Sequence, residues 1–363
     1  MKKKVVVHII PRFCFGGAER LLVLYAQMYD TAVYDMHVVS CVEDGELRAS
    51  FDGLPVSLFV GSRLQHGGRW GAWRAVRRYL DRVQPDIVHT HLLSSDLIGF
   101  VYKYIYRRRV QWVSTQHNVE DTRPWVYRFL WRMILPAADA VIAVAPRVYE
   151  FARDTFGVSD KRLHVVNNGI LVQKWKPLLS QPVCRQKVLQ IASIGRLEIQ
   201  KGHVYALRAL AQLSKDISWH YHVYGDGMLR EELQQLAHEL YIDDRITWHG
   251  VVNTLEQDLG SVDIVFQPSL FEGLSLVILE SMAAGRCVVT TPAGGEGVIT
   301  HGVDGYIVPS MDVEMMSAQL TTLALDRQQI IRTAAAAGVL AQREFDVSKN
   351  MHGIETVYQQ LLS

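Results

Sequence analysis

The sequence predicts an α/β protein with two doubly wound, Rossmann-like domains that face each other across a cleft. Short runs of β-branched and apolar residues alternate with longer helical patterns along the whole chain, which is typical of parallel sheets covered by helices on both faces. A chain of 363 residues is also long for a single hydrophobic core. We therefore expect two domains of similar architecture.

The expected strands are nearly continuous apolar runs, which favours strands buried on both faces of a sheet. In the first domain these runs are residues 5–10, 36–42, 56–60, 86–91, 112–116, 140–144 and 164–168. In the second domain they are residues 188–194, 219–225, 246–250, 263–268 and 287–291.

The segment 174–187 separates the two series of strands. Two prolines and several polar residues interrupt the alternation there, which favours a domain boundary. We expect residues 1–178 to form the N-terminal domain and residues 179–345 the C-terminal domain. Residues 346–363 are expected to form a helix that packs back on the N-terminal domain.

Composition and charge limit the classes of function. The chain is 49% hydrophobic and 21% charged, as expected of a soluble globular protein, and 38 Lys+Arg balance 37 Asp+Glu. The chain therefore has no overall positive electrostatic field of the kind that indicates a nucleic-acid binder, and nucleic acid is not an expected partner. The four cysteines are far apart without zinc-ligand spacing, which favours reduced thiols in a cytoplasmic protein. Neither a metal nor another cofactor is expected.

The N-terminal stretch MKKKVVVHIIPRF superficially resembles a signal peptide. Its apolar part is short, contains His8 and stops at Pro11 without a small-residue cleavage site, so a first β-strand is the better interpretation. No uninterrupted apolar run approaches the length of about 18 residues that a membrane-spanning helix requires. We expect no transmembrane helix.

Three strand-to-helix junctions carry residues suited to ligand binding, because ligands of open α/β sheets bind beyond the carboxyl ends of the strands. After the first strand, Gly16 and Gly17 allow close backbone approach at a helix start, although such a pair can also be only a tight turn. No dinucleotide-binding or P-loop glycine motif occurs.

The second junction is GRLEIQKG. Arg196 and Lys201 stand between a strand end and the next helix, where two cations suit a diphosphate that gains charge as a bond breaks. The alternative is a surface arginine and lysine, with Glu198 as a local partner.

The third junction is FEGLSLVILE. Glu272 lies in the loop, the helix is expected to begin near Ser275, and Glu280 lies more than one turn into it. A carboxylate on that helix can accept two hydrogen bonds from the vicinal diol of a ribose. The alternative is a buried helix with two incidental glutamates.

Histidines gather at strand ends of the first domain, as His89 and His91 in DIVHTH and as His117 in STQHN. A histidine in such a place is commonly a hydrogen-bonded structural residue, and we keep that interpretation for His89. His117 ends a strand at the expected cleft, which favours a role at the reactive centre.

Together these motifs resemble those of a known family. FGGAER, GRLEIQKG, FEGLSLVILESMAAGRCVV with its E-x7-E spacing, and PAGGEGVITHGVDGYIVP occur in this order. They are similar to the motifs of the retaining GT-B glycosyltransferases of family four (group 1), whose fold has two facing Rossmann-like domains. The resemblance covers almost the whole chain.

The resemblance implies a nucleotide-sugar donor held by the C-terminal domain and an acceptor bound by the N-terminal domain. It implies that Arg196 and Lys201 hold the diphosphate and that Glu280 binds the ribose. Glu272 is implied to contact the donor sugar, and His117 to lie near the transferred sugar. The implied catalytic residues are His117, Arg196, Lys201 and Glu272. The other implied donor-binding residues are Gly16 and Gly17 over the phosphates, Tyr224, Gly225 and Val251 around the base, and Gly273, Leu274, Ser275 and Leu276 at the helix start.

The family's chemistry retains the anomeric configuration and needs no divalent metal. The resemblance therefore implies transfer of a sugar from a nucleotide-sugar, a UDP-sugar in preference to a GDP-sugar, to a glycan or lipid-linked acceptor in envelope polysaccharide biosynthesis. One departure is the acidic spacer before Lys201, where Glu198 can offset the charge of Arg196.

Three segments of the first domain combine aromatic with basic residues: 69–83, 102–112 and 123–135. In the third, Trp125 and Phe129 follow helical spacing. A basic aromatic helix can lie on an anionic membrane surface, or it can pack in the core with arginines that reach solvent. The first alternative makes the protein peripheral at the inner face of the membrane, with a lipid-linked sugar or another envelope glycan as acceptor.

Rival functions remain open. A nucleotide-sugar epimerase of the same architecture would convert its donor without an acceptor, and a non-catalytic sugar-nucleotide sensor would bind the donor without releasing nucleotide. A glycoside hydrolase needs two carboxylates that flank one bond, which a Glu280 inside a helix does not suit. A Rossmann dehydrogenase lacks its glycine motif here.

Overall fold

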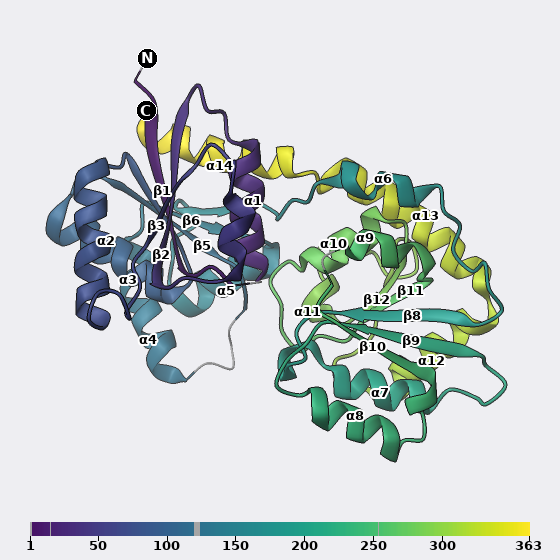
Figure 1. Ribbon diagram of the computed structural model, residues 1–363. Coiled ribbons are helices and arrows are strands. Elements are labelled where there is room, and N and C mark those ends of the chain that lie inside the picture. The colour runs from purple at the N-terminus through teal and green to yellow at the C-terminus, as the bar shows by residue number, and fades with distance from the viewer. Residues whose placement is uncertain (1, 15, 120–123, 253) are drawn as a thin grey trace. The chain divides into compact units, whose positions relative to one another are not determined.

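The computed structural model describes residues 2–14, 16–119, 124–252 and 254–363. The chain forms two compact units (Figure 1): unit 1 contains Met1–Gly169 and Val347–Ser363, and unit 2 contains Ile170–Asp346. The division lies before the expected boundary at 178, because helix α6 (Val172–Leu179) packs on helices of unit 2. The C-terminal helix α14 (Val347–Leu362) belongs to unit 1.

Unit 1 contains a seven-stranded sheet in the order β3-β2-β1-β4-β5-β6-β7. All its paired strands are parallel. The order reverses between β1 and β4, so the loops after these two strands diverge at this switch point. The strands are β1 Lys4–Arg12, β2 Tyr34–Glu43, β3 Ser57–Val60, β4 Ile87–His91, β5 Gln111–Gln116, β6 Ala140–Ala143 and β7 Leu163–Val165.

The helices of unit 1 cover both faces of its sheet (Figure 1). Two apolar clusters bury the strands, one beneath α2 and α3 and the other beside α4 and α5. The helices are α1 Gly17–Met28, α2 Arg69–Val83, α3 Leu93–Val101, α4 Trp125–Ile134, α5 Pro146–Phe156 and α14. Helix α14 contacts α1.

Unit 2 repeats this topology with a six-stranded parallel sheet in the order β10-β9-β8-β11-β12-β13. Its switch point lies between β8 and β11. The strands are β8 Leu189–Ile194, β9 Trp219–Tyr224, β10 Ile246–Gly250, β11 Ile264–Gln267, β12 Cys287–Thr290 and β13 Tyr306–Ile307. The sequence pattern did not predict β13, because a strand of 2 residues is too short to show a periodic pattern.

The helices of unit 2 surround one large apolar core. Every residue of β8, β11 and β12 is buried, as expected of strands covered on both faces. The helices are α6, α7 His203–Ala211, α8 Arg230–Glu239, α9 Leu255–Asp258, α10 Leu276–Ala283, α11 Pro292–Gly295, α12 Val313–Leu325 and α13 Arg327–Glu344.

A fully buried arginine ties α6 to the body of unit 2. Arg286 donates hydrogen bonds to the backbone carbonyls of Leu178, Gln181, Val262 and Ala284 at 2.9–3.0 Å. Burial lowers its pKa to about 10. The segment that the sequence suggested as a linker is therefore fixed near its middle, at Leu178 and Gln181, by a charged side chain.

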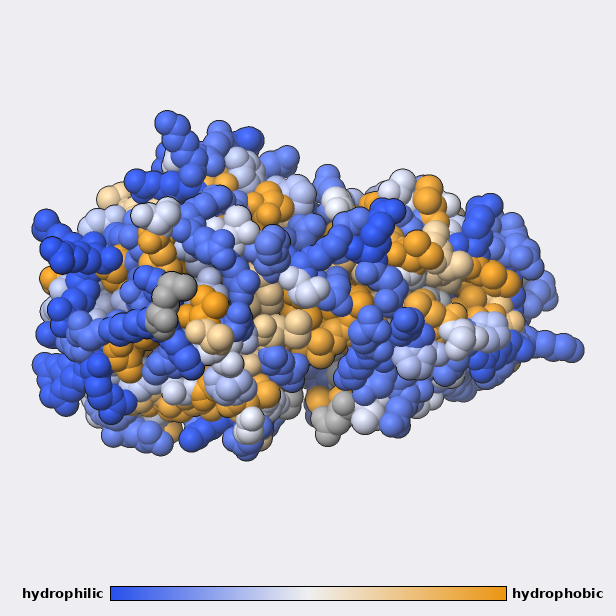
Figure 2. Space-filling model, turned by 90° about the horizontal axis from the view of Figure 1, so that it is seen from above, coloured by the Kyte–Doolittle hydropathy of each residue, from blue (hydrophilic) through white to orange (hydrophobic). Residues whose placement is uncertain are grey.

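The surface shown in Figure 2 is mainly hydrophilic, with hydrophobic residues in scattered groups. On α4, however, Trp125, Phe129 and Met133 are exposed at 75%, 53% and 62%. Among the helices of the described residues, none has both the length and the hydrophobicity to cross a bilayer.

Candidate functional site

The switch point of unit 2 brings two of the predicted loops together. One follows β8 and contains Gly195 to Lys201, and the other follows β11 and contains Glu272. They are joined where Leu270 N–H donates to the Gln200 carbonyl at 2.8 Å and the Gln200 amide donates to the Phe271 carbonyl at 2.9 Å. The GRLEIQKG and FEGLSLVILE motifs thus meet at the carboxyl edge of the sheet.

Lys201 and Glu272 form an ion pair across these loops. Their side chains are only 13% and 9% exposed. The same Glu272 oxygen accepts a hydrogen bond from Ser269 at 3.1 Å. A buried pair of this kind holds both charges in fixed positions, because each would otherwise lack a partner.

Arg196 differs from Lys201 in its surroundings. Its side chain is 58% exposed and its guanidinium contacts Glu198 at 3.0 Å. The acidic spacer therefore pairs with Arg196, as the sequence suggested. An exposed ion pair contributes little free energy, so Arg196 can exchange Glu198 for an anion of higher charge.

Helix α10 begins after Ser275, as predicted, and this residue makes no side-chain capping hydrogen bond. The first-turn N–H groups of a helix have no partner within the helix, which makes them a site for anions. Leu274 and Leu276 are buried, Gly273 is half-buried, and Glu280 is only 4% exposed. The motif therefore contributes apolar side chains to the hydrophobic core and also a buried carboxylate.

The residues predicted around the base lie at the ends of β9 and β10. Gly225 N–H donates to the Gly250 carbonyl at 2.7 Å, next to Val251. The φ of Gly225 is +127°, and a Cβ there would lie 1.9 Å from the Gly195 carbonyl oxygen, so only glycine fits. Tyr224 is buried and its ring stacks on His249 with centroids 4.3 Å apart. Burial raises the pKa of Tyr224.

In unit 1, Gly16 precedes α1 and Gly17 is its first residue. Neither has a positive φ, and the Glu19 carboxylate lies 2.2 Å from where a Gly16 Cβ would be. The close approach at Gly16 in this structure is therefore to an acidic side chain of the same helix. Residue 15, within the predicted FGGAER motif, lies outside the described residues.

His117, which is partly buried, continues a chain of buried histidines that the sequence pattern only partly revealed. His91 Nδ1 lies 2.9 Å from His117 Nε2, and His8 Nδ1 lies 3.0 Å from His91 Nε2. His8 Nε2 lies 3.0 Å from the Tyr29 hydroxyl. The position of His8 was missed because β1 and β4 are distant in sequence and become neighbours only through the topology of the sheet.

These histidines are neutral near pH 7. Burial lowers the pKa of His8 to about 3 and that of His117 to about 4. Burial and the neighbouring imidazoles also hold the pKa values of His89 and His91 well below the ordinary range. His89 contacts the Tyr358 hydroxyl at 2.5 Å and the Thr115 hydroxyl at 2.6 Å, as expected for a structural residue.

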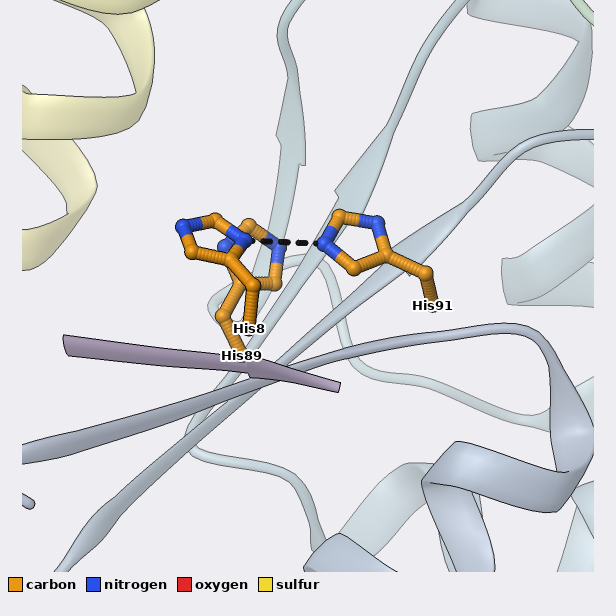
Figure 3. Close-up of side chains that lie close together, drawn as sticks. All are labelled: His8, His89 and His91. Atoms are coloured by element: carbon orange, nitrogen blue, oxygen red, sulfur yellow. Dashed lines mark hydrogen bonds between the residues drawn. The ribbon is translucent and has the colours of Figure 1, made fainter. Parts of the chain in front are cut away.

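Nitrogens of His8, His89 and His91 lie within 4.8 Å of one another, a separation that could suit a metal ion. Figure 3 shows instead that nitrogens of His8 and His91 face each other across a hydrogen bond. The second nitrogen of His8 and both nitrogens of His89 contact hydroxyl groups. Hydrogen bonds among the side chains thus account for this cluster.

The two doubly wound sheets, with the predicted diphosphate and ribose residues at the switch point of unit 2, place the protein in the GT-B class of glycosyltransferases. The family model described as Glycosyltransferase Family 4 matches residues 15–174, and that of Glycosyl transferases group 1 matches residues 189–326. The chain belongs to this family.

Known relatives and structures agree with this assignment. A glycosyltransferase of Methanocaldococcus jannaschii is 26% identical over 61% of this chain and 62% of its own length. The Escherichia coli UDP-Gal:alpha-D-GlcNAc-diphosphoundecaprenol alpha-1,3-galactosyltransferase is 20% identical over 97% of this chain and 96% of its own. The crystal structure of Anabaena HepE with UDP and glucose has a TM-score of 0.85 at 21% identity, covering 98% of this chain and 100% of that one.

Proposed function

We propose that this protein is a retaining glycosyltransferase that moves a sugar from a nucleotide-sugar, a UDP-sugar in preference to a GDP-sugar, to a lipid-linked or other glycan acceptor. The observation that carries the proposal is the buried Lys201–Glu272 ion pair at the switch point of unit 2. It lies between the loop of Arg196 and the helix that carries Glu280. Lys201 and Arg196 suit the negative diphosphate of a nucleotide-sugar, and Glu280 offers hydrogen-bond acceptors to its ribose.

The diphosphate would bind to Lys201, Arg196 and the first N–H groups of α10. Lys201 is held in place by Glu272 before any ligand arrives. A diphosphate leaving group becomes more negative as the glycosidic bond breaks, and fixed cations and helix-start amides stabilise that charge. Glu272 then faces the donor sugar, where its carboxylate stabilises the positive charge that develops at the reacting carbon.

The ribose would bind to Glu280. This carboxylate is buried on α10, and an ionised carboxylate can accept hydrogen bonds from both hydroxyls of a vicinal diol. The base would lie at the ends of β9 and β10, against Tyr224, Gly225 and Val251. The structure of HepE with UDP and glucose supports a uridine nucleotide.

The reaction would proceed with retention and without a divalent metal. In front-face attack, the leaving phosphate takes the proton of the acceptor hydroxyl on the same side of the sugar. The positive charge that a metal would otherwise supply comes from Lys201, Arg196 and the α10 amides. The resemblance of the motifs assigns Gly16 and Gly17 to the phosphates and His117 to the transferred sugar.

The acceptor would be a sugar carried on a lipid diphosphate at a membrane surface. Two relatives support this class, since their names specify diphosphoundecaprenol-linked acceptors. Helix α4 supports it independently. Its exposed Trp125, Phe129 and Met133 recur every fourth residue and form one apolar stripe.

The opposite side of α4 is fixed to unit 1. Trp131 and Ile134 are buried, and the Trp131 indole donates to Asp96 at 2.9 Å. Arg132 donates to the Thr155 carbonyl at 3.0 Å and keeps a basic group beside the stripe. Exposed aromatic residues with adjacent arginines suit an anionic lipid surface. The protein would then be cytoplasmic and peripheral at the inner face of the membrane.

The direct test is a transfer assay with UDP-sugars and undecaprenyl-diphosphate-linked sugars, in which UDP release and the product are followed together. We expect UDP release that depends on the acceptor and a product with the anomeric configuration of the donor. Conversion of the UDP-sugar to an epimeric UDP-sugar without an acceptor and without net release of UDP would support the epimerase. Binding of the nucleotide-sugar without turnover on any lipid-linked acceptor would support the sensor.

A further inference from the structure

His8, His91 and His117 form a chain of hydrogen bonds with a definite direction. We propose that this chain, which ends at Tyr29, holds His117 in the tautomer with its proton on Nε2 and offers the lone pair of Nδ1 to a hydroxyl group of a bound sugar. Tyr29, His8 and His91 are then positioning residues that act through His117. Only the identity of the ligand hydroxyl rests on the proposed function.

The topology of unit 1 builds the chain. His8 on β1 is paired with His89 on β4, and His91 is paired with Thr115 on β5. Because side chains two residues apart share one face of a strand, His89 and His91 lie on the same face, and His117 follows Thr115 on that face. The chain therefore extends from the middle of β1 to the carboxyl end of β5.

Each contact between imidazoles has the geometry of a hydrogen bond in line with the rings. For His8 and His91, the planes differ by 17° and the centroids are 5.3 Å apart, with nitrogens at 3.0 Å (Figure 3). For His91 and His117, the planes differ by 31° and the centroids are 5.2 Å apart, with nitrogens at 2.9 Å. The N–H of one ring thus points along the lone pair of the next.

A neutral imidazole has one donor nitrogen and one acceptor nitrogen. In a chain of neutral imidazoles, the direction of the bond at one end therefore fixes the direction of every bond along it. The chain has two states: all rings donate toward Tyr29, or all donate toward the ligand side of His117. The hydroxyl groups at the Tyr29 end decide between them.

At that end, Tyr29 donates to the Tyr358 hydroxyl at 3.2 Å. The Tyr358 hydroxyl lies 2.5 Å from His89 Nδ1, whereas the Tyr29 hydroxyl lies 3.0 Å from His8 Nε2. A hydroxyl group has one proton to donate and can also accept. Because the proton of Tyr29 is directed to Tyr358, Tyr29 accepts from His8 Nε2, which is closer to Tyr29 than to Tyr358 at 3.4 Å.

This direction passes along the whole chain. His8 donates from Nε2 to Tyr29, His91 donates from Nε2 to His8, and His117 donates from Nε2 to His91. The Nδ1 atom of His117 is left as an acceptor, and no residue among those the structure describes forms a hydrogen bond with it. His117 is only partly buried, so this atom is available to a ligand hydroxyl.

The test is long-range ¹H–¹⁵N NMR of histidine side chains in the full-length protein at neutral pH, with His117 assigned by the signals lost in His117→Gln. We expect a single Nε2–H tautomer for His117 in the wild type. His91→Phe should give a mixture of tautomers, and Tyr29→Phe should raise the Nδ1–H population. His91→Gln, which keeps a donor and an acceptor, should restore the Nε2–H form.

Tyr34→Phe is the matched control, because its ring packs against Tyr29 and Tyr358 outside the chain. We expect it to leave the His117 tautomer unchanged. In a transfer assay, Tyr29→Phe should lower kcat/KM by roughly fivefold, the loss expected from one hydrogen bond. A wild-type His117 protonated on Nδ1, or a tautomer unaffected by both His91→Phe and Tyr29→Phe, would overturn the proposal even if the protein is an active glycosyltransferase.

Discussion

Lys201 and Glu272 form an ion pair in which both side chains are nearly buried, although they belong to loops that follow different strands of unit 2. The two loops meet at the switch point between β8 and β11, so the pair occupies the place where doubly wound sheets bind ligands. The ammonium and the carboxylate are thereby held ready at one edge of the sheet.

This relationship predicts that two cations of one motif respond differently to substitution. Lys201→Ala leaves Glu272 buried without its partner and should lower the free energy of unfolding by about 3–5 kcal/mol. Arg196→Ala removes only the exposed ion pair with Glu198 and should change the free energy of unfolding by less than about 0.5 kcal/mol. The same substitution should nevertheless lower turnover. Equal loss of stability in both variants, or full activity of Arg196→Ala, would contradict these roles.

Glu280 is predicted to act in donor binding rather than in the chemical step. Glu280→Ala should raise the KM for the UDP-sugar by roughly tenfold with a smaller change in kcat, because contacts to the ribose are the same in the ground and transition states. Glu232→Gln on α8 is an exposed control and should behave as the wild type. A large loss of kcat at unchanged KM would assign Glu280 a different role.

The buried histidines predict a loss of stability in mild acid. Histidine in the unfolded chain titrates near 6.5, whereas the pKa of His8 is lowered to about 3. Between these values the unfolded state binds more protons, so the free energy of unfolding falls as the pH falls, by about 1.4 kcal/mol per pH unit for His8. The full contribution is present above pH 6.5.

Urea unfolding between pH 7 and pH 5 would measure this slope. His8→Gln removes one titrating group and keeps a donor and an acceptor, so its slope should be shallower than that of the wild type. Identical slopes in the two proteins would show that His8 takes up its proton in the folded state.

The apolar stripe of α4 predicts binding to anionic vesicles that weakens with salt. A Trp125→Ser/Phe129→Ser variant should bind at least tenfold more weakly, because each aromatic side chain contributes about 1.5–3 kcal/mol on burial. Trp70→Ser on α2 removes an equally exposed tryptophan and should have little effect. If the wild type stays in the supernatant in co-sedimentation with anionic vesicles at low salt, the proposed binding to a membrane surface is wrong.

Arg286 predicts a purely structural effect. Arg286→Ala leaves four backbone carbonyls without their donor and should lower the free energy of unfolding by about 3 kcal/mol or more. Arg343→Ala removes a side chain that is 67% exposed and should cost less than about 0.5 kcal/mol. Similar melting temperatures for the two variants would contradict this account of α6.

The sequence could predict the elements because periodicity and junction motifs are local. The strands of both sheets other than β13, the start of α10 after Ser275 and the pairing of Arg196 with Glu198 all follow from neighbours in the chain. The histidine chain and the Lys201–Glu272 pair could not be predicted in the same way, because they depend on which strands become neighbours. The unit boundary before α6 depends equally on a distant residue, Arg286.

The most direct test of the central claim is calorimetric titration of UDP into the full-length wild type and the Lys201→Ala variant at one pH and salt concentration. The account predicts saturable binding of UDP to the wild type and a Kd at least tenfold higher in the variant, a difference of about 1.4 kcal/mol. Equal affinity of the two folded proteins for UDP would contradict the placement of the donor diphosphate at the Lys201–Glu272 pair.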